Sequence, residues 1–157
     1  MKSKKYFMFI CRAIFILYIL GLCYFLFFAE ILGFGRMHDS EVYQYNLELF
    51  KEIERFYRYR HQLGFKAVFL NLAGNVIGFI PFGMLTPILF PVAKRMISVI
   101  CLTFLLSLSF ETLQLIFKVG SFDVDDLLLN TIGGLLGYIL YKVVSIRSSY
   151  GKRQKAV

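Results

Sequence analysis

Residues 96–117 read MISVICLTFLLSLSFETLQLIF, an apolar run whose single charged residue is Glu111. The short stretch KVGSFD (118–123) separates this run from a second one, VDDLLLNTIGGLLGYILYKVV (124–144). A helix needs about 20 mainly apolar residues to cross a bilayer. Both runs are continuous and do not alternate with a period of two, which favours helices over the strands of a barrel. The stretch therefore predicts two antiparallel transmembrane helices joined by a tight loop.

Two further apolar runs lie upstream of this pair. Residues 67–90 precede it across the loop 91–95, and residues 7–31 follow three lysines at the N-terminus. The first run is longer than the 7–15-residue core of a signal peptide and lacks a small-residue cleavage site, so we interpret it as a retained anchor. We expect an all-α membrane protein: one domain over residues 1–157, built as a bundle of four transmembrane helices (7–31, 67–90, 96–117 and 124–144). An outer loop (33–66) and a basic tail (145–157) complete it.

The composition supports a membrane protein. Of the 157 residues, 58% are hydrophobic and 18% are charged, and the mean hydropathy is +0.65. Soluble globular chains are about 25% charged, so this chain has too little polar surface to cover a water-facing core. The net charge of +8 could suit a nucleic-acid partner, but the basic residues cluster at the ends of apolar runs. We therefore expect membrane lipids as partners and no nucleic acid.

The distribution of charge predicts the orientation in the membrane. Four spans place both termini on one side, which carries eleven basic residues and no acidic one, against seven basic residues on the other side. The positive-inside rule then places both termini in the cytoplasm of a plasma-membrane protein. All ten acidic residues would lie outside or in the outer halves of the helices. We expect the basic tail, Arg147 to Lys155, to be frayed and held near anionic lipid.

Apolar residues recur in the outer loop at spacings of three and four. Val42, Tyr45, Leu49, Ile53 and Phe56 form this pattern, which predicts an amphipathic helix capped by Asp39 or Ser40. Such a helix could lie on the outer membrane face. A loop packed over the bundle is an equally good interpretation.

Polar residues follow one face of each of the last three spans. The second span carries Asn71 and Asn75, with Gly74 and Gly78 on the same face; the third carries Ser107, Glu111, Gln114 and Lys118; the fourth carries Asp126 and Asn130, with Gly133 and Gly137. Polar groups in a membrane usually face the bundle interior or an aqueous pocket. We expect Glu111, Gln114, Asp126, Asn130 and Asn75, together with Asn71, Asp123 and Asp125, to converge on one pocket open to the outside.

Each part of this candidate site has a structural alternative. Asp123, Asp125 and Asp126 could cap the fourth helix and stabilise its first turn. The asparagines and Gln114 could be hydrogen-bonding links between helices. The glycine pairs at i and i+4 predict close packing of the second helix on the fourth. Pro81 removes a hydrogen bond to the carbonyl of Ile77, so we expect a kink or an irregular half-span there.

The chemistry of the candidate site stays open at this point. Glu111, Asp125 and Asp126 could hold a hard cation or serve as acid and base. No motif of a known catalytic machine, phosphate-binding loop or metal site is present, so no catalytic residue, cofactor or metal is assigned.

Several sequence blocks resemble the VanZ-like family of bacterial membrane proteins. They are NLAGN (71–75), FIPFG (79–83), ETLQ (111–114), DVDDLLLNTIGG (123–134) and GY (137–138), with NLELF (46–50) as a weaker upstream block. The resemblance implies a multi-pass protein of the cell envelope with a role in resistance to glycopeptide antibiotics of the teicoplanin type. It supplies no reaction.

Three function classes remain open from the sequence. The first is a non-enzymatic protein that changes how lipid-bearing glycopeptides meet the outer leaflet. The second is an intramembrane enzyme that acts on an envelope lipid or a lipid-linked substrate through Glu111 and Asp126. The third is a small transporter or accessory subunit, which would need to oligomerise. Expected partners are membrane lipids, together with a lipoglycopeptide drug or a lipid-linked cell-wall component.

Overall fold

A computed structural model describes residues 2–28, 43–59 and 65–154 of the chain. Four of its helices are long and apolar enough to cross a membrane, so the protein is an all-α chain with four candidate spans. The elements are α1 (Lys2–Phe28), β1 (Tyr45–Asn46), α2 (Lys51–Arg58), α4 (Phe65–Leu89), the 3₁₀ helix η2 (Pro91–Lys94), α5 (Met96–Phe117), β2 (Phe122–Asp123) and α6 (Val124–Gln154).

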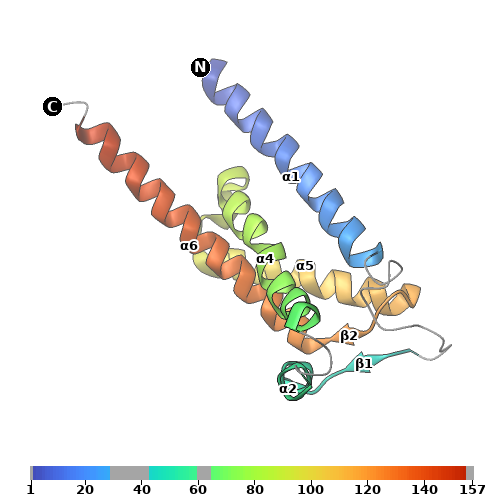
Figure 1. The fold of residues 1–157 in the computed structure, drawn as a ribbon. Helices are drawn as coiled ribbons and strands as arrows, with labels where there is room; N and C mark the ends of the chain where they lie inside the picture. The colour runs from blue at the N-terminus through green and yellow to red at the C-terminus, as the bar shows by residue number, and fades with distance from the viewer. Residues whose placement is uncertain (1, 29–42, 60–64, 155–157) are drawn as a thin grey trace.

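The two ends of the molecule contain different parts of the chain. Figure 1 shows both chain termini at one end and β1, β2 and α2 together at the other. The two short strands pair in parallel, with Tyr45 opposite Phe122 and Asn46 opposite Asp123. The segment between α1 and α4 is thereby tied to the turn that joins α5 to α6.

Helices α4 and α6 form the most extensive contact of the bundle, and glycines allow it. A Cβ atom placed on Gly83 would lie 1.9 Å from the carbonyl oxygen of Gly134, and one on Gly137 would lie 2.1 Å from that of Ile80. Gly133 meets the carbonyl of Val76 in the same way, at 2.2 Å. The two backbones therefore touch directly over two helical turns.

Two of the glycines expected at this contact lie elsewhere. A Cβ atom on Gly74 would meet nothing within 4 Å, and one on Gly78 would meet the side chain of Leu22 in α1. The α4 side of the crossing is formed by Gly83, which the spacing pattern did not include. Gly74 and Gly78 face α1, because they lie on a different side of α4 from Gly83.

Pro81 does not interrupt α4. The helix runs without a break from Phe65 to Leu89 and contains both Pro81 and Pro87. The expectation of an irregular half-span was therefore wrong. The hydroxyl of Tyr18 in α1 donates at 2.7 Å to the carbonyl of Gly78, next to the Ile77 carbonyl that Pro81 cannot bond.

Helix α1 packs on α4 and leaves most of its own surface exposed. Leu22 of α1 joins Phe79 and Phe110 in one buried cluster. A second cluster lies toward the other end of the bundle and contains Ala93, Val99 and Tyr138. Only 11% of the span in α1 is buried, compared with 28–33% in the other three, so α1 is the peripheral helix.

The outer loop differs from the amphipathic helix expected over residues 42–56. Tyr45 and Asn46 are extended and paired with β2, and α2 begins only at Lys51. Phe50 takes the left-handed conformation (φ 68°) directly before α2, so a single helix cannot run through it. The expected caps Asp39 and Ser40 lie outside the described residues.

The tail also differs from the expectation. Helix α6 continues past Val144 to Gln154, so residues 145–154 extend the last span as helix.

Candidate functional site

Asp125 connects the first turn of α6 to the start of α2. Its side chain is fully buried, and its two carboxylate oxygens accept three backbone N–H groups. Oδ1 accepts from Phe50 at 2.5 Å, and Oδ2 accepts from Glu52 at 2.9 Å and from Ile53 at 3.3 Å. The first N–H groups of a helix have no partner within it and carry a partial positive charge, so a carboxylate there is stabilised. Asp125 therefore caps α2 from 72 to 75 residues away.

Asp123 and Glu111 continue this arrangement. Asp123 precedes α6, and its Oδ1 accepts the N–H of Asp125 at 2.9 Å, which is an N-cap interaction within α6. The N–H of Asp123 in turn donates to Oε2 of Glu111 in α5 at 3.0 Å. Glu111 and Asp123 are 3% and 5% exposed. We call Glu111, Asp123 and Asp125 the acidic brace, because together they join α5, α6 and α2.

Asn46 links β1 to the acidic brace. Its Nδ2 donates to Oδ1 of Asp123 at 3.1 Å, and its Oδ1 accepts the N–H of Glu48 at 3.2 Å. Burial raises the pKa of the Asp123 carboxyl above its ordinary value, while the hydrogen bonds from the Asp125 N–H and from Asn46 oppose the rise. The side chain of Asn46 thus fixes both the turn after β1 and the acid that caps α6.

The other expected site residues make separate contacts. Asn75 of α4 donates to the carboxylate of Asp126. Asn130 donates to the hydroxyl of Ser107 at 2.8 Å, and Gln114 donates to the backbone carbonyl of Leu26 in α1 at 2.9 Å. Asn71 lies in α4, but its side chain is outside the described residues.

The polar stripes thus supply hydrogen bonds between the elements of the bundle. Glu111, Asp125 and Asn130 are all less than 4% exposed, and each forms hydrogen bonds between elements. The pocket open to the outside stays a prediction, and these three side chains lie in the interior of the described structure. Oδ1 of Asn130 is buried with no hydrogen-bond partner in the structure. Among the described residues, no three His, Cys, Asp or Glu side chains are grouped as metal ligands.

The acidic brace holds a segment rich in exposed aromatic and aliphatic side chains. We call residues 43–59 the loop segment. Its exposed apolar residues are Tyr43, Tyr45, Leu47, Leu49, Phe50, Tyr57 and Tyr59. Its charged residues pair locally, as in the contact of Lys51 with Glu48 at 2.9 Å, and Nζ of Lys118 lies 4.9 Å from the ring centre of Tyr43. Tyrosines beside basic residues are typical of the headgroup zone of a membrane.

A groove of about 440 Å³ runs between α1 and α4. Gly21 of α1 and Gly74 and Gly78 of α4 are among its lining residues, and Asn75 lies along it. Because the three glycines have no side chains, they leave this space between the helices. Most of the lining is apolar, and the groove lies within two of the candidate spans. The groove is therefore suited to hydrocarbon more than to water.

Comparison with known proteins places this arrangement in a family. The sequence profile of the VanZ/LLP1 family matches residues 15–145, which include the acidic brace, the loop segment and the groove. The chain belongs to the VanZ/LLP1 family. Protein VanZ of Enterococcus faecium is 41% identical over 73 residues, which are 46% of this chain and 45% of that protein. The chain thus aligns with less than half the length of this curated relative, and no solved structure matches it significantly.

Sequence reasoning missed several residues of this VanZ/LLP1 site. Asn46 belongs to the weaker block NLELF, but no role was assigned to it. Ser107 belongs to the polar stripe of the third span, but the sequence did not predict that Asn130 would donate to its hydroxyl. An Asn side chain often hydrogen-bonds the backbone two residues further on, and this tendency could have indicated the bend between Asn46 and Glu48.

Proposed function

We propose that this VanZ/LLP1 protein acts at the outer leaflet of the plasma membrane and lowers susceptibility to lipid-tailed glycopeptide antibiotics. The observation that carries the proposal is family membership, together with the 41% identity to Protein VanZ. The resistance phenotype itself comes from the family resemblance. The geometry supports a physical route by which such a protein could act.

The route begins with the loop segment. Its exposed tyrosines and leucines suit the boundary between headgroups and hydrocarbon, and the acidic brace fixes the segment over the ends of α5 and α6. A drug that carries an acyl chain partitions into the same boundary. The groove between α1 and α4 offers an apolar space of about 440 Å³ for such a chain. The protein would then change how the drug sits in the leaflet without transforming it chemically.

The contacts of the carboxylates favour this binding role over acid–base catalysis. Asp125 uses both oxygens, and Glu111 uses Oε2, to accept backbone N–H groups. A general acid or base must reach a proton of the substrate directly or through one water. The carboxylates of the acidic brace instead accept backbone N–H groups and so stabilise the fold.

The outer-leaflet role requires both termini to be cytoplasmic, which single cysteines can test. In a chain with Cys11, Cys23 and Cys101 replaced by alanine, we expect a cysteine at position 57 to react with a membrane-impermeant maleimide on intact cells. Cysteines at positions 3 and 150 should react only after permeabilisation, because the basic residues favour the cytoplasm. Labelling of positions 3 and 150 from outside, with position 57 protected, would place the loop segment in the cytoplasm and end the proposal.

Expression in a susceptible Gram-positive host tests the resistance role. We expect the protein to raise the inhibitory concentration of teicoplanin several-fold and that of vancomycin much less, because vancomycin lacks an acyl tail. Membrane fractionation must first show equal amounts of each variant. Equal susceptibility of expressing cells and empty-vector cells would remove the resistance role from this chain.

A conservative variant distinguishes a structural role of Glu111 in the acidic brace from a role as a catalytic acid. Glu111→Gln keeps an amide oxygen that can accept the N–H of Asp123, so the brace interpretation predicts that most of the resistance remains. Catalysis by Glu111 would predict a loss of about 10²–10⁴-fold in rate, and therefore loss of the phenotype. A null phenotype for Glu111→Gln, with normal protein levels, would favour the enzyme.

A further inference from the structure

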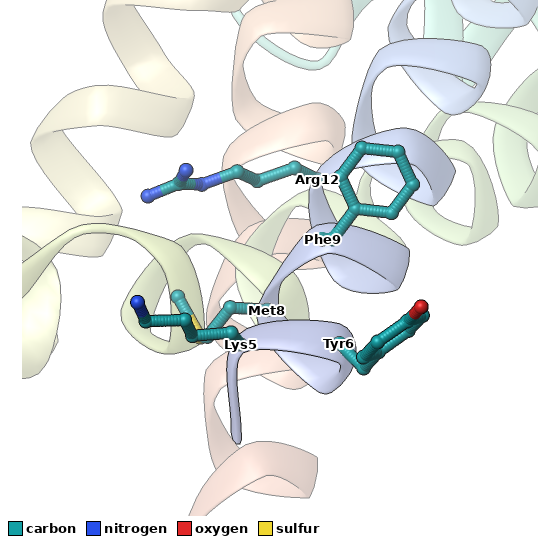
Figure 2. A pocket seen from close by; sticks show the side chains of 5 residues that line it. All are labelled: Lys5, Tyr6, Met8, Phe9 and Arg12. Atoms are coloured by element: carbon teal, nitrogen blue, oxygen red, sulfur yellow. The ribbon is translucent and has the colours of Figure 1, made fainter. Parts of the chain in front are cut away.

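A second cavity lies at the end of α1 that is far from the acidic brace. It has a volume of about 650 Å³ and is lined by Lys5, Tyr6, Met8, Phe9 and Arg12. Figure 2 shows that Lys5 and Arg12 extend toward the same side of α1. This agreement follows from their spacing, because seven residues are close to two turns of helix. The cavity is thus an open hollow along α1, where two cationic groups lie beside apolar and aromatic side chains.

Arg12 lies inside the candidate span of α1. The span begins at Lys5, so Arg12 lies seven residues after its first residue, or about 10 Å along the helix axis at 1.5 Å per residue. A charged side chain in this position is costly, and such residues usually mark a pathway or a binding site. A long side chain reduces the cost by extending its charged end toward the headgroups. The guanidinium of Arg12 can therefore reach the headgroup zone, where phosphate groups are available as partners.

Within residues 2–28, 43–59 and 65–154, no acidic side chain pairs with Arg12. The acidic residues that the structure describes are at positions 48–54 and 111–126, toward the end of the bundle that holds α2 and β1. Among the described residues, Arg12 forms no ion pair, whereas Arg55 and Arg58 pair within α2. Arg12 and Lys5 thus form a cationic pair without an acidic partner in the part of the chain that the structure describes.

We propose that this cavity binds the phosphate of an anionic phospholipid in the leaflet at the N-terminal end of α1. Arginine presents a planar fork of donors that matches two phosphate oxygens, and Lys5 adds a second positive charge. Met8 and Phe9 provide apolar contact for the lipid below its headgroup. A headgroup with a net negative charge fits better than phosphatidylcholine, because the choline cation would be repelled by the second basic residue. The site is independent of the proposed resistance role.

Photo-crosslinking in nanodiscs tests this site with the full chain. The probes are photoreactive phosphatidylglycerol and photoreactive phosphatidylcholine, each diluted in a phosphatidylcholine bilayer. We expect phosphatidylglycerol to label the peptide that contains residues 5–12, and Arg12→Gln to reduce this labelling about tenfold, since a charge-assisted contact is lost. Arg12→Lys should keep more of the labelling than Arg12→Gln, because it retains the charge.

The matched control is Arg95→Gln. Arg95 is exposed at the same end of the bundle and does not line the cavity, so its loss should change labelling of residues 5–12 by less than about twofold. Lys5→Gln provides a second test at the rim of the span, should Arg12→Gln fail to insert. Equal labelling by both probes, unchanged labelling in Arg12→Gln or Lys5→Gln, or full competition by soluble glycerol 3-phosphate would each overturn the proposal.

Discussion

Asp125→Ala is expected to release the loop segment from the bundle and to lower the free energy of unfolding by about 3 kcal/mol. The carboxylate of Asp125 accepts the N–H groups of Phe50, Glu52 and Ile53, and alanine leaves all three without this partner. An unsatisfied buried donor costs about 1–3 kcal/mol, and water at the surface restores part of that loss. The same substitution should make residues 47–59 more sensitive to protease.

The matched control for this variant is Glu54→Ala. Glu54 pairs with Arg58 in α2, but both side chains are about two-thirds exposed, so the pair contributes about 0–1 kcal/mol. Denaturation in detergent and limited proteolysis of the two variants measure the difference. If Asp125→Ala were as stable and as protease-resistant as Glu54→Ala, the loop segment would not depend on the acidic brace.

The four spans were predictable because they depend on local properties. Each apolar run is long enough to cross a bilayer by itself, and no distant contact is needed to define it. The inward direction of the polar stripes was predictable for the same reason, since Glu111 and Asn130 cannot easily face lipid. The structure buries both residues.

The loop segment was not predictable from its own sequence. The spacing of its apolar residues fits a helix through residue 50, but Asn46 pairs with β2 and with Asp123 instead. The start of α2 is set by Asp125, which lies 75 residues beyond Phe50 in the chain. A helical pattern within a window of 15 residues carries no information about such a distant cap.

The glycine pattern shows a similar limit. The i, i+4 spacing of Gly133 and Gly137 identified the face of α6 that meets α4. The same spacing in α4 selected Gly74 and Gly78, whereas the contact with α6 uses Gly83. The pattern states which residues share a face, but not which neighbouring helix that face meets.

Gly83→Ala is expected to separate α4 from α6 and to destabilise the protein by about 3 kcal/mol, the upper end of the usual range for overpacking. The new Cβ atom would lie 1.9 Å from the carbonyl oxygen of Gly134 and 2.7 Å from its carbonyl carbon. Both are backbone atoms, so no side chain can rotate to relieve the contact. The helices must move apart, and the neighbouring contacts of Gly133 and Gly137 would weaken with them.

Gly74→Ala makes the same chemical change in the same helix, but it should stabilise the protein instead of destabilising it. A Cβ atom on Gly74 meets nothing within 4 Å, and alanine is favoured over glycine in a helix by up to about 1 kcal/mol. Thermal unfolding in detergent measures both variants. It can be monitored by the reaction of the buried Cys11 with a thiol-reactive dye, in a chain with Cys23 and the exposed Cys101 replaced by alanine. Equal melting temperatures for Gly83→Ala and Gly74→Ala would contradict the direct backbone contact of α4 with α6 at Gly83.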